Sequence, residues 1–207
     1  MAFETCASGG GWIDLGMFRF TDQAWASDNT DPYDRLFIQE GFSMAYPARV
    51  MMCWVADPGK WVRGREASIT YRFHSSMMGS LGIGVDLTRW SEREMREASK
   101  LVEKYKQVRD IIQQGDLYRL LSPRAGDTTA VQYVSRDRSR SVLFVLRHSH
   151  QWPEPVPTIY PRGLEPGRVY RTTIEEAPVR GEALMRRGTE VSLDGELSST
   201  MVEITEA

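Results

Sequence analysis

The residues best suited to chemistry lie in two short stretches near the start of the chain. Three consecutive glycines, Gly9–Gly11, follow a run typical of a strand. Without Cβ atoms, they let backbone amides approach a ligand closely. Further on, Trp25, Asp28 and Asp31 follow a second strand-like run and precede a helical pattern. Because barrel enzymes place their catalytic groups in such strand-to-helix loops, a carboxylate here is a catalytic candidate.

Each of these features also has a purely structural interpretation. A glycine run by itself is more often a flexible turn than a binding site. The two aspartates would both serve as caps of the following helix. Because Pro32 suits the first helical position, we assign Asp31 to the cap and Asp28 to the chemistry.

The elements that must position these residues change in character near residue 122. Before it, short apolar runs alternate with helical patterns, and after it strand-like runs are separated by turns. This order predicts an α/β part followed by an all-β part, with domains at 1–122 and 123–207. The strands expected in the first part are Ala2–Cys6, Asp22–Ala26, Val50–Val55 and Leu81–Asp86.

Two helices of the first part are indicated by the residues at their ends. One should run from a cap at Asp31 until Pro47 stops it. The other begins with a capping box, Ser91 with Glu94 three residues on, and keeps a helical apolar spacing as far as Gly115. Both helices are interpreted as scaffold.

The second part is expected to be a small antiparallel β-sandwich. Thr129–Ser135 and Ser141–Arg147 flank a charged turn as a hairpin, and Thr200–Ile204 alternates as a closing strand. We interpret its role as structural.

A carbohydrate-binding role for the second part stays open as an alternative. The aromatic side chains of Trp152, Tyr160 and Tyr170 are equally suited to stacking on a sugar and to filling a core.

Composition excludes several classes of function. The chain has 207 residues, and its net charge of −2 gives no electrostatic footprint for nucleic acid. No apolar run approaches the roughly 18 residues of a membrane span, and residues 1–11 do not resemble a secretory signal. Cys6 and Cys53 lack disulfide or metal-ligand spacing, so we predict no metal, no cofactor and a cytoplasmic location.

The run CASGGG at 6–11, followed by DLG and WASDNTD, resembles the signature region of family 36 glycoside hydrolases. Arg35, IQEGFSMAY at 38–46 and GDLYRLLSP at 115–123 match in the same order. The resemblance implies a retaining α-galactosidase of the melibiase and raffinose-hydrolase type, which hydrolyses terminal α-D-galactosyl residues of galacto-oligosaccharides.

The resemblance also implies roles for individual residues. Asp28, the first aspartate of the SDNTD motif, would be the general acid/base. Cys6, Ser8 and Gly9 would contact the hydroxyl groups of galactose, and Trp25 would form a wall of the pocket.

The sequence departs from the family pattern at three places. The nucleophile of the family lies in a KWDxN-like motif, which does not occur here. Trp12 stands where GGGRFD would place an arginine, and Cys53 and Trp54 stand where a histidine is expected on the next strand.

A complete barrel takes about 250 residues, so the resemblance implies the C-terminal half of a (β/α)₈ TIM barrel followed by the sandwich. We therefore interpret the chain as a C-terminal fragment that carries the acid/base without the nucleophile and is inactive by itself. In full-length form we expect an α-galactoside substrate, a homo-oligomer, and neither nucleic acid nor membrane as partner. Two alternatives stay open: a non-catalytic α-galactoside-binding module, and an assembly module whose exposed sheet edge is covered by another copy.

Overall fold

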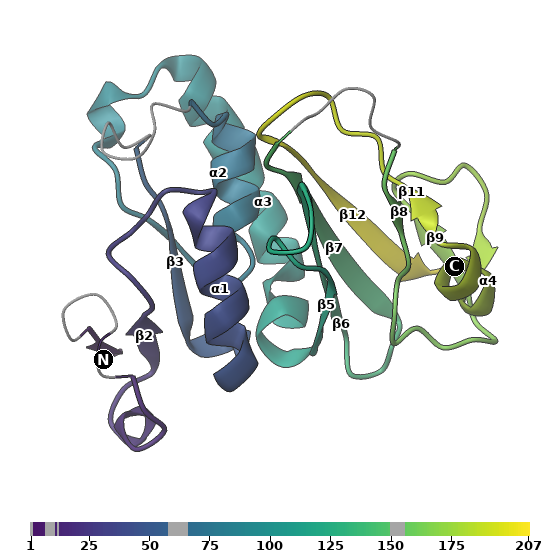
Figure 1. Cartoon of the computed structure of the whole chain (residues 1–207), viewed down its shortest axis with the longest axis horizontal. Helices are drawn as coiled ribbons and strands as arrows, with labels where there is room; N and C mark the ends of the chain where they lie inside the picture. The colour runs from purple at the N-terminus through teal and green to yellow at the C-terminus, as the bar shows by residue number, and fades with distance from the viewer. Residues whose placement is uncertain (1, 7–10, 12, 58–65, 150–155) are drawn as a thin grey trace. The chain divides into compact units, whose positions relative to one another are not determined.

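The computed structural model describes residues 2–6, 11, 13–57, 66–149 and 156–207. The chain divides into two compact units, 1–107 and 108–207, and the division lies inside the long helix α3 (Glu92–Gln114). The elements of both units are labelled in Figure 1. Parallel strands with helices make up the first unit and antiparallel strands dominate the second, which confirms the predicted change from α/β to all-β.

The first unit contains a four-stranded parallel sheet whose strands lie in chain order. They are β1 (Glu4–Thr5), β2 (Gln23–Trp25), β3 (Met51–Val55) and β4 (Ser80–Ile83). Helices α1 (Asp34–Ala45) and α2 (Ile69–Ser76) pack against β3, as Figure 1 shows. The 3₁₀ turns are η1 (Met17–Arg19), η2 (Ala48–Val50) and η3 (Leu87–Arg89).

All four predicted strands are confirmed, although β4 ends earlier than expected. Asp86, which the sequence places at the end of this strand, instead accepts a hydrogen bond from the backbone N–H of Thr88 and caps η3.

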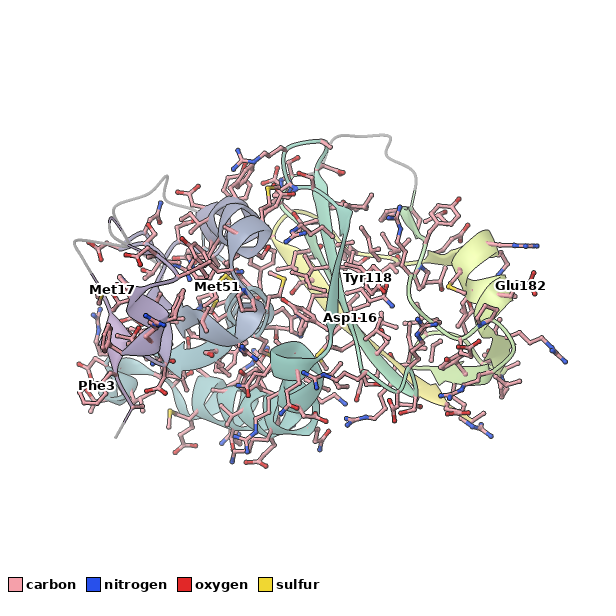
Figure 2. The ribbon with its side chains drawn as sticks, turned by 90° about the horizontal axis from the view of Figure 1, so that it is seen from below. Phe3, Met17, Met51, Asp116, Tyr118 and Glu182 are labelled. Atoms are coloured by element: carbon pink, nitrogen blue, oxygen red, sulfur yellow. The ribbon has the colours of Figure 1, made fainter. Side chains whose placement is uncertain are left out.

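The two faces of the parallel sheet differ in the side chains that they carry. Successive residues of a strand point to opposite faces. On one face Ala24, Met51 and Cys53 form a buried apolar cluster with Phe42 of α1. Figure 2 shows Met51 inside the first unit, whereas Phe3 and Met17 lie at its margin. The opposite face therefore carries the alternate residues of β2 and β3.

Both predicted helix starts are confirmed by their hydrogen bonds. The side chain of Asp31 accepts hydrogen bonds from the backbone N–H groups of Tyr33 and Asp34, so it caps α1 as predicted. Ser91 and Glu94 form the reciprocal bonds of the capping box before α3. Local polar contacts of this kind are specified by sequence alone.

The second unit is built on a six-stranded antiparallel sheet of order β10-β9-β12-β7-β6-β5, beside a two-stranded sheet of β11 and β8. Helix α4 (Gly181–Arg187) follows β10. The strands are β5 (Asp116–Leu121), β6 (Thr128–Val134), β7 (Arg140–Arg147), β8 (Thr158–Ile159), β9 (Val169–Thr172), β10 (Val179–Arg180), β11 (Thr189–Glu190) and β12 (Ser198–Glu206).

The predicted hairpin is confirmed as β6 and β7, and the predicted last strand is confirmed as β12. Strand β12 lies between β7 and β9. Leu143 of β7, Val202 of β12 and Leu184 of α4 share one fully buried core.

Candidate active site

Asp28 lies three residues beyond Trp25, the last residue of β2. The indole Nε1 of Trp25 donates a hydrogen bond of 2.7 Å to Oδ1 of Asp28. Trp25 is 8% exposed, whereas Asp28 is exposed. A buried ring thus orients an accessible carboxylate.

The loop from β2 to α1 separates Asp28 from the capping aspartate. Asn29 donates through its amide to the carboxylate of Asp34, at 2.8 Å, and accepts from the backbone N–H of Asp31. The carboxylate of Asp31 is in turn bonded to the start of α1. Asp31 is therefore committed to the helix, whereas Asp28 is held by a side chain of the strand.

Arg35 fixes the base of this loop from inside the first unit. Its side chain is 2% exposed and donates to the backbone oxygens of Met52, at 2.6 Å, and Ser27, at 3.4 Å. Its guanidinium carbon lies 5.7 Å from the centre of the Trp25 ring, a cation–π distance. Arg35 therefore contacts the loop, β3 and Trp25, whose indole is bonded to Asp28.

Cys53 lies beside the same guanidinium, with 3.6 Å between Nη2 of Arg35 and its Sγ atom. Burial raises the pKa of the Cys53 thiol, while the nearby Arg35 charge and hydrogen bond act in the opposite direction. Cys53 is fully buried within the helix-facing cluster, so its position indicates packing.

Cys6 is brought toward the same edge of the sheet as Trp25. Strands β1 and β2 are parallel, and Thr5 lies opposite Ala24, so the residues that follow each strand leave the sheet at the same end. Cys6 is exposed and has a free thiol. The two other predicted sugar contacts, Ser8 and Gly9, lie outside the described residues.

The two described aromatic residues considered for sugar binding in the second unit, Tyr160 and Tyr170, differ in their exposure to solvent. Tyr170 is fully buried, and its hydroxyl donates to the carbonyl of Arg138, so it is a core residue. Tyr160 is 52% exposed and borders an open pocket of about 470 Å³ together with Glu175 and Arg187. Trp152 lies outside the described residues.

Neither a metal site nor a membrane-spanning helix is found in the described ranges. No group of three or more His, Cys, Asp or Glu side chains in them is placed to hold a metal ion. Within the same ranges, no helix combines the length and apolar character needed to cross a bilayer.

Comparison with known proteins adds to this geometry. Residues 1–115, which include β2 and the Asp28 loop, match the family model described as Melibiase. The chain belongs to the Melibiase family. Residues 128–204 also match the model of the glycosyl hydrolase family 36 C-terminal domain.

Curated and solved relatives in the Melibiase family agree over nearly the whole chain. The probable alpha-galactosidase G of Emericella nidulans is 34% identical over 98% of this chain. The crystal structure of the GH36 alpha-galactosidase AgaB from Geobacillus stearothermophilus superposes with a TM-score of 0.95 at 34% identity over all of it. A variant of AgaA from the same organism, in complex with raffinose, gives 0.95 at 33% identity and full coverage.

The chain spans 28% of the Emericella nidulans protein and 29% of each of the two Geobacillus chains. The family-model match, the sequence identities and the structural superpositions confirm the predicted resemblance to family 36 enzymes.

Two contacts of this site were not predicted from the sequence, namely those of Arg35 and of Trp54 with Trp25. Arg35 entered the sequence argument only as a family match, and Trp54 only as a departure. The three residues come from α1, β3 and β2, and no local spacing reports a contact between separate elements.

Proposed function

We propose that this chain supplies the general acid/base of a retaining α-galactosidase, with Asp28 in that role. The observation that carries the proposal is the exposed Asp28 carboxylate, bonded at 2.7 Å to the indole of Trp25 at the end of β2, within the part that matches the Melibiase model. The naming of relatives as alpha-galactosidases and the raffinose complex of AgaA support the substrate class.

In this proposal the first part, 1–122, is the C-terminal half of a (β/α)₈ barrel, and 123–207 is a C-terminal β-sandwich. The order of the parallel strands and the placement of Asp28 beyond the carboxyl end of β2 support a barrel, because barrel enzymes bind substrate at that end. The domain limits, the cytoplasmic location and the homo-oligomer stay predictions.

A retaining glycosidase uses two carboxyl groups about 5–5.5 Å apart. One attacks the anomeric carbon, and the other protonates the leaving oxygen and then takes a proton from water. Asp28 is assigned the second role, and the nucleophile is assigned to a part of the enzyme outside these 207 residues. Cys6, Ser8 and Gly9 are proposed to contact the galactose hydroxyls, and Trp25 to form the pocket wall.

The test compares α-galactosidase activity of the 207-residue chain with that of a protein extended at its N-terminus by the upstream reading frame. Only the extended protein should hydrolyse p-nitrophenyl α-galactoside and raffinose. Asp28→Asn in the extended protein should lower kcat/KM on raffinose at least about 100-fold, the usual contribution of a general acid. Added azide should partly restore the turnover of p-nitrophenyl α-galactoside by the Asp28→Asn variant, and α-galactosyl azide should form.

Asp31→Asn is the matched control, because it makes the same chemical change three residues along and asparagine caps a helix about as well as aspartate. It should keep activity within about threefold of the parent. Equal losses for Asp28→Asn and Asp31→Asn would contradict the assignment. Hydrolysis by the short chain would show that the nucleophile lies within it, and galactose binding without turnover by the extended protein would favour the binding-module alternative.

A further inference from the structure

The side chain of Trp54 in β3 lies against the neighbouring chain segment of β4, where positions 82 and 84 are both glycine. The parallel register sets Trp54 opposite Gly82, and Gly84 is the next residue of the chain on the same face. A Cβ atom on Gly82 would lie 2.6 Å from Cδ1 of Trp54, and one on Gly84 would lie 2.3 Å from Cε3. The two glycines therefore admit the two ends of the indole against the backbone.

The same indole contacts Trp25 on its other neighbouring strand. Trp25 lies opposite Met52 in the register of β2 and β3, so Trp54 is two residues further along the same face of β3. The two rings meet edge to face, with 4.9 Å between centroids and 62° between planes. Aromatic pairs prefer this edge-to-face geometry, so the contact favours one orientation of the Trp25 ring.

These contacts continue to the carboxylate, because the N–H of Trp25 donates to Asp28. We propose that Trp54 is a positioning residue for Asp28, which acts by holding the Trp25 indole at the angle that this hydrogen bond requires. Gly82 and Gly84 contribute to this positioning, because the absence of a Cβ atom at each lets the Trp54 ring lie where it does. The inference rests on the proposed function only in assigning catalysis to Asp28, and the contacts themselves do not depend on it.

The nitrogen of Trp54 supports a role for its ring. Within the described part of the chain, Nε1 of Trp54 is buried and has no hydrogen-bond partner. A buried donor without a partner is destabilising, so a hydrogen bond of its own does not explain why tryptophan occupies this position. A buried donor without a hydrogen-bond partner departs from the usual rules of packing, and such departures are expected where function requires a particular side chain. Phenylalanine at position 54 should therefore retain the effect, and alanine should lose it.

The hydrogen bond between Trp25 and Asp28 can be followed in the 207-residue chain by NMR of ¹⁵N-labelled indole groups. The chain has six tryptophans, so Trp25→Phe and Trp54→Phe identify the two signals. In the parent the hydrogen bond to Asp28 should displace the Trp25 N–H signal downfield, and Asp28→Ala should remove that displacement at constant neutral pH.

The NMR effect is the displacement of the Trp25 N–H signal that Asp28→Ala removes. Trp54→Ala and Gly84→Ala should each reduce this displacement about twofold or more, because a hydrogen bond weakens steeply once its angle is lost. Trp54→Phe should leave most of it. Gly41→Ala in α1 is the matched control, since a Cβ there meets nothing within 4 Å, and it should change nothing. If Trp54→Ala does not fold, Trp54→Leu replaces it.

An unaltered Trp25 signal in folded Trp54→Ala and Gly84→Ala variants would overturn the proposal. A second arm uses the extended enzyme, in which Gly84→Ala should lower kcat about tenfold with little change in KM, as expected when a catalytic group is misplaced. An NMR effect that stays the same size in both variants contradicts the positioning role, whatever the activity of the extended enzyme. If both variants reduce the NMR effect but the extended parent enzyme is inactive, only the proposed function is contradicted.

Discussion

At the scale of single residues, the site depends on two buried side chains that serve one exposed carboxylate. Trp25 donates to Asp28, and Arg35 lies against the Trp25 ring while it donates to backbone oxygens of the loop and of β3. The charge of Arg35 is spread over a planar group with several donors, which suits it to such a junction better than lysine. The orientation of Asp28 is therefore set by the side chains of Trp25 and Arg35.

Arg35→Met should lower the free energy of unfolding by about 3 kcal/mol, because the buried carbonyl of Met52 loses a charged donor and is left unsatisfied. Urea denaturation followed by tryptophan fluorescence measures this change. Arg93→Met on α3, where the side chain is exposed, should change stability by less than about 0.5 kcal/mol. Equal effects of the two variants would contradict the anchoring role of Arg35.

At the scale of elements, α2 is the most deeply buried helix segment beside the sheet. Its residues from Tyr71 to Ser76 are all buried. His74 is among them, and desolvation lowers the pKa of its imidazole from 6.5 to about 4. The folded chain therefore keeps His74 neutral at pH values where the unfolded chain would protonate it.

This difference makes stability depend on pH in one direction. Between pH 6.5 and about 4 the unfolded state binds more protons, so the stability of the fold is full above 6.5 and decreases as the pH falls through this window. A shift of this size corresponds to a total loss of roughly 3 kcal/mol. In His74→Gln the fall in unfolding free energy from pH 7.5 to pH 4 should be smaller by about that amount. Parallel pH profiles for parent and variant would show that His74 does not titrate in this way.

At the scale of the whole molecule, the parallel sheet of the first unit has two outer strands. Within the described residues β1 and β4 each pair with a single neighbour, so each presents a sheet edge. Apolar side chains are exposed around its N-terminal part, with exposed fractions of 55% for Phe3, 70% for Leu15 and 74% for Phe20. Figure 2 shows Phe3 at this margin. Surfaces of this kind favour association.

The 207-residue chain should therefore associate with itself as its concentration rises, and sedimentation velocity over a hundredfold concentration range would detect this. Leu15→Glu with Phe20→Glu should weaken the association about tenfold or more, because charges would then be placed on the apolar margin. Met44→Glu, at a residue of α1 that is 67% exposed, provides the control and should leave association unchanged. A monomer at all concentrations would contradict both the prediction and the assembly alternative.

The sequence by itself determined the features that rest on contacts between neighbours in the chain. The cap at Asp31, the capping box at Ser91 and the hairpin of β6 and β7 were all predictable, because each is made within a few residues. The capping role of Asp31 followed from Pro32, whereas the acid/base role of Asp28 stays a proposal. The family was predictable from the motif around Cys6 and Asp28, since the glycine run and the SDNTD stretch occur together in the order that the family requires.

Contacts between separate helices and strands were decided only by the tertiary structure. Helix α2 escaped prediction because it is only eight residues long and because Arg72, His74, Ser75 and Ser76 are buried in it, so its burial does not follow the apolar residues. The place of β12 between β7 and β9 depends on pairing between strands far apart in sequence. The contacts of Arg35, Trp54 and Gly84 around Trp25 likewise join α1 with strands of the sheet. Local patterns fix caps and turns, but they carry no record of which distant surfaces meet when the sheet assembles.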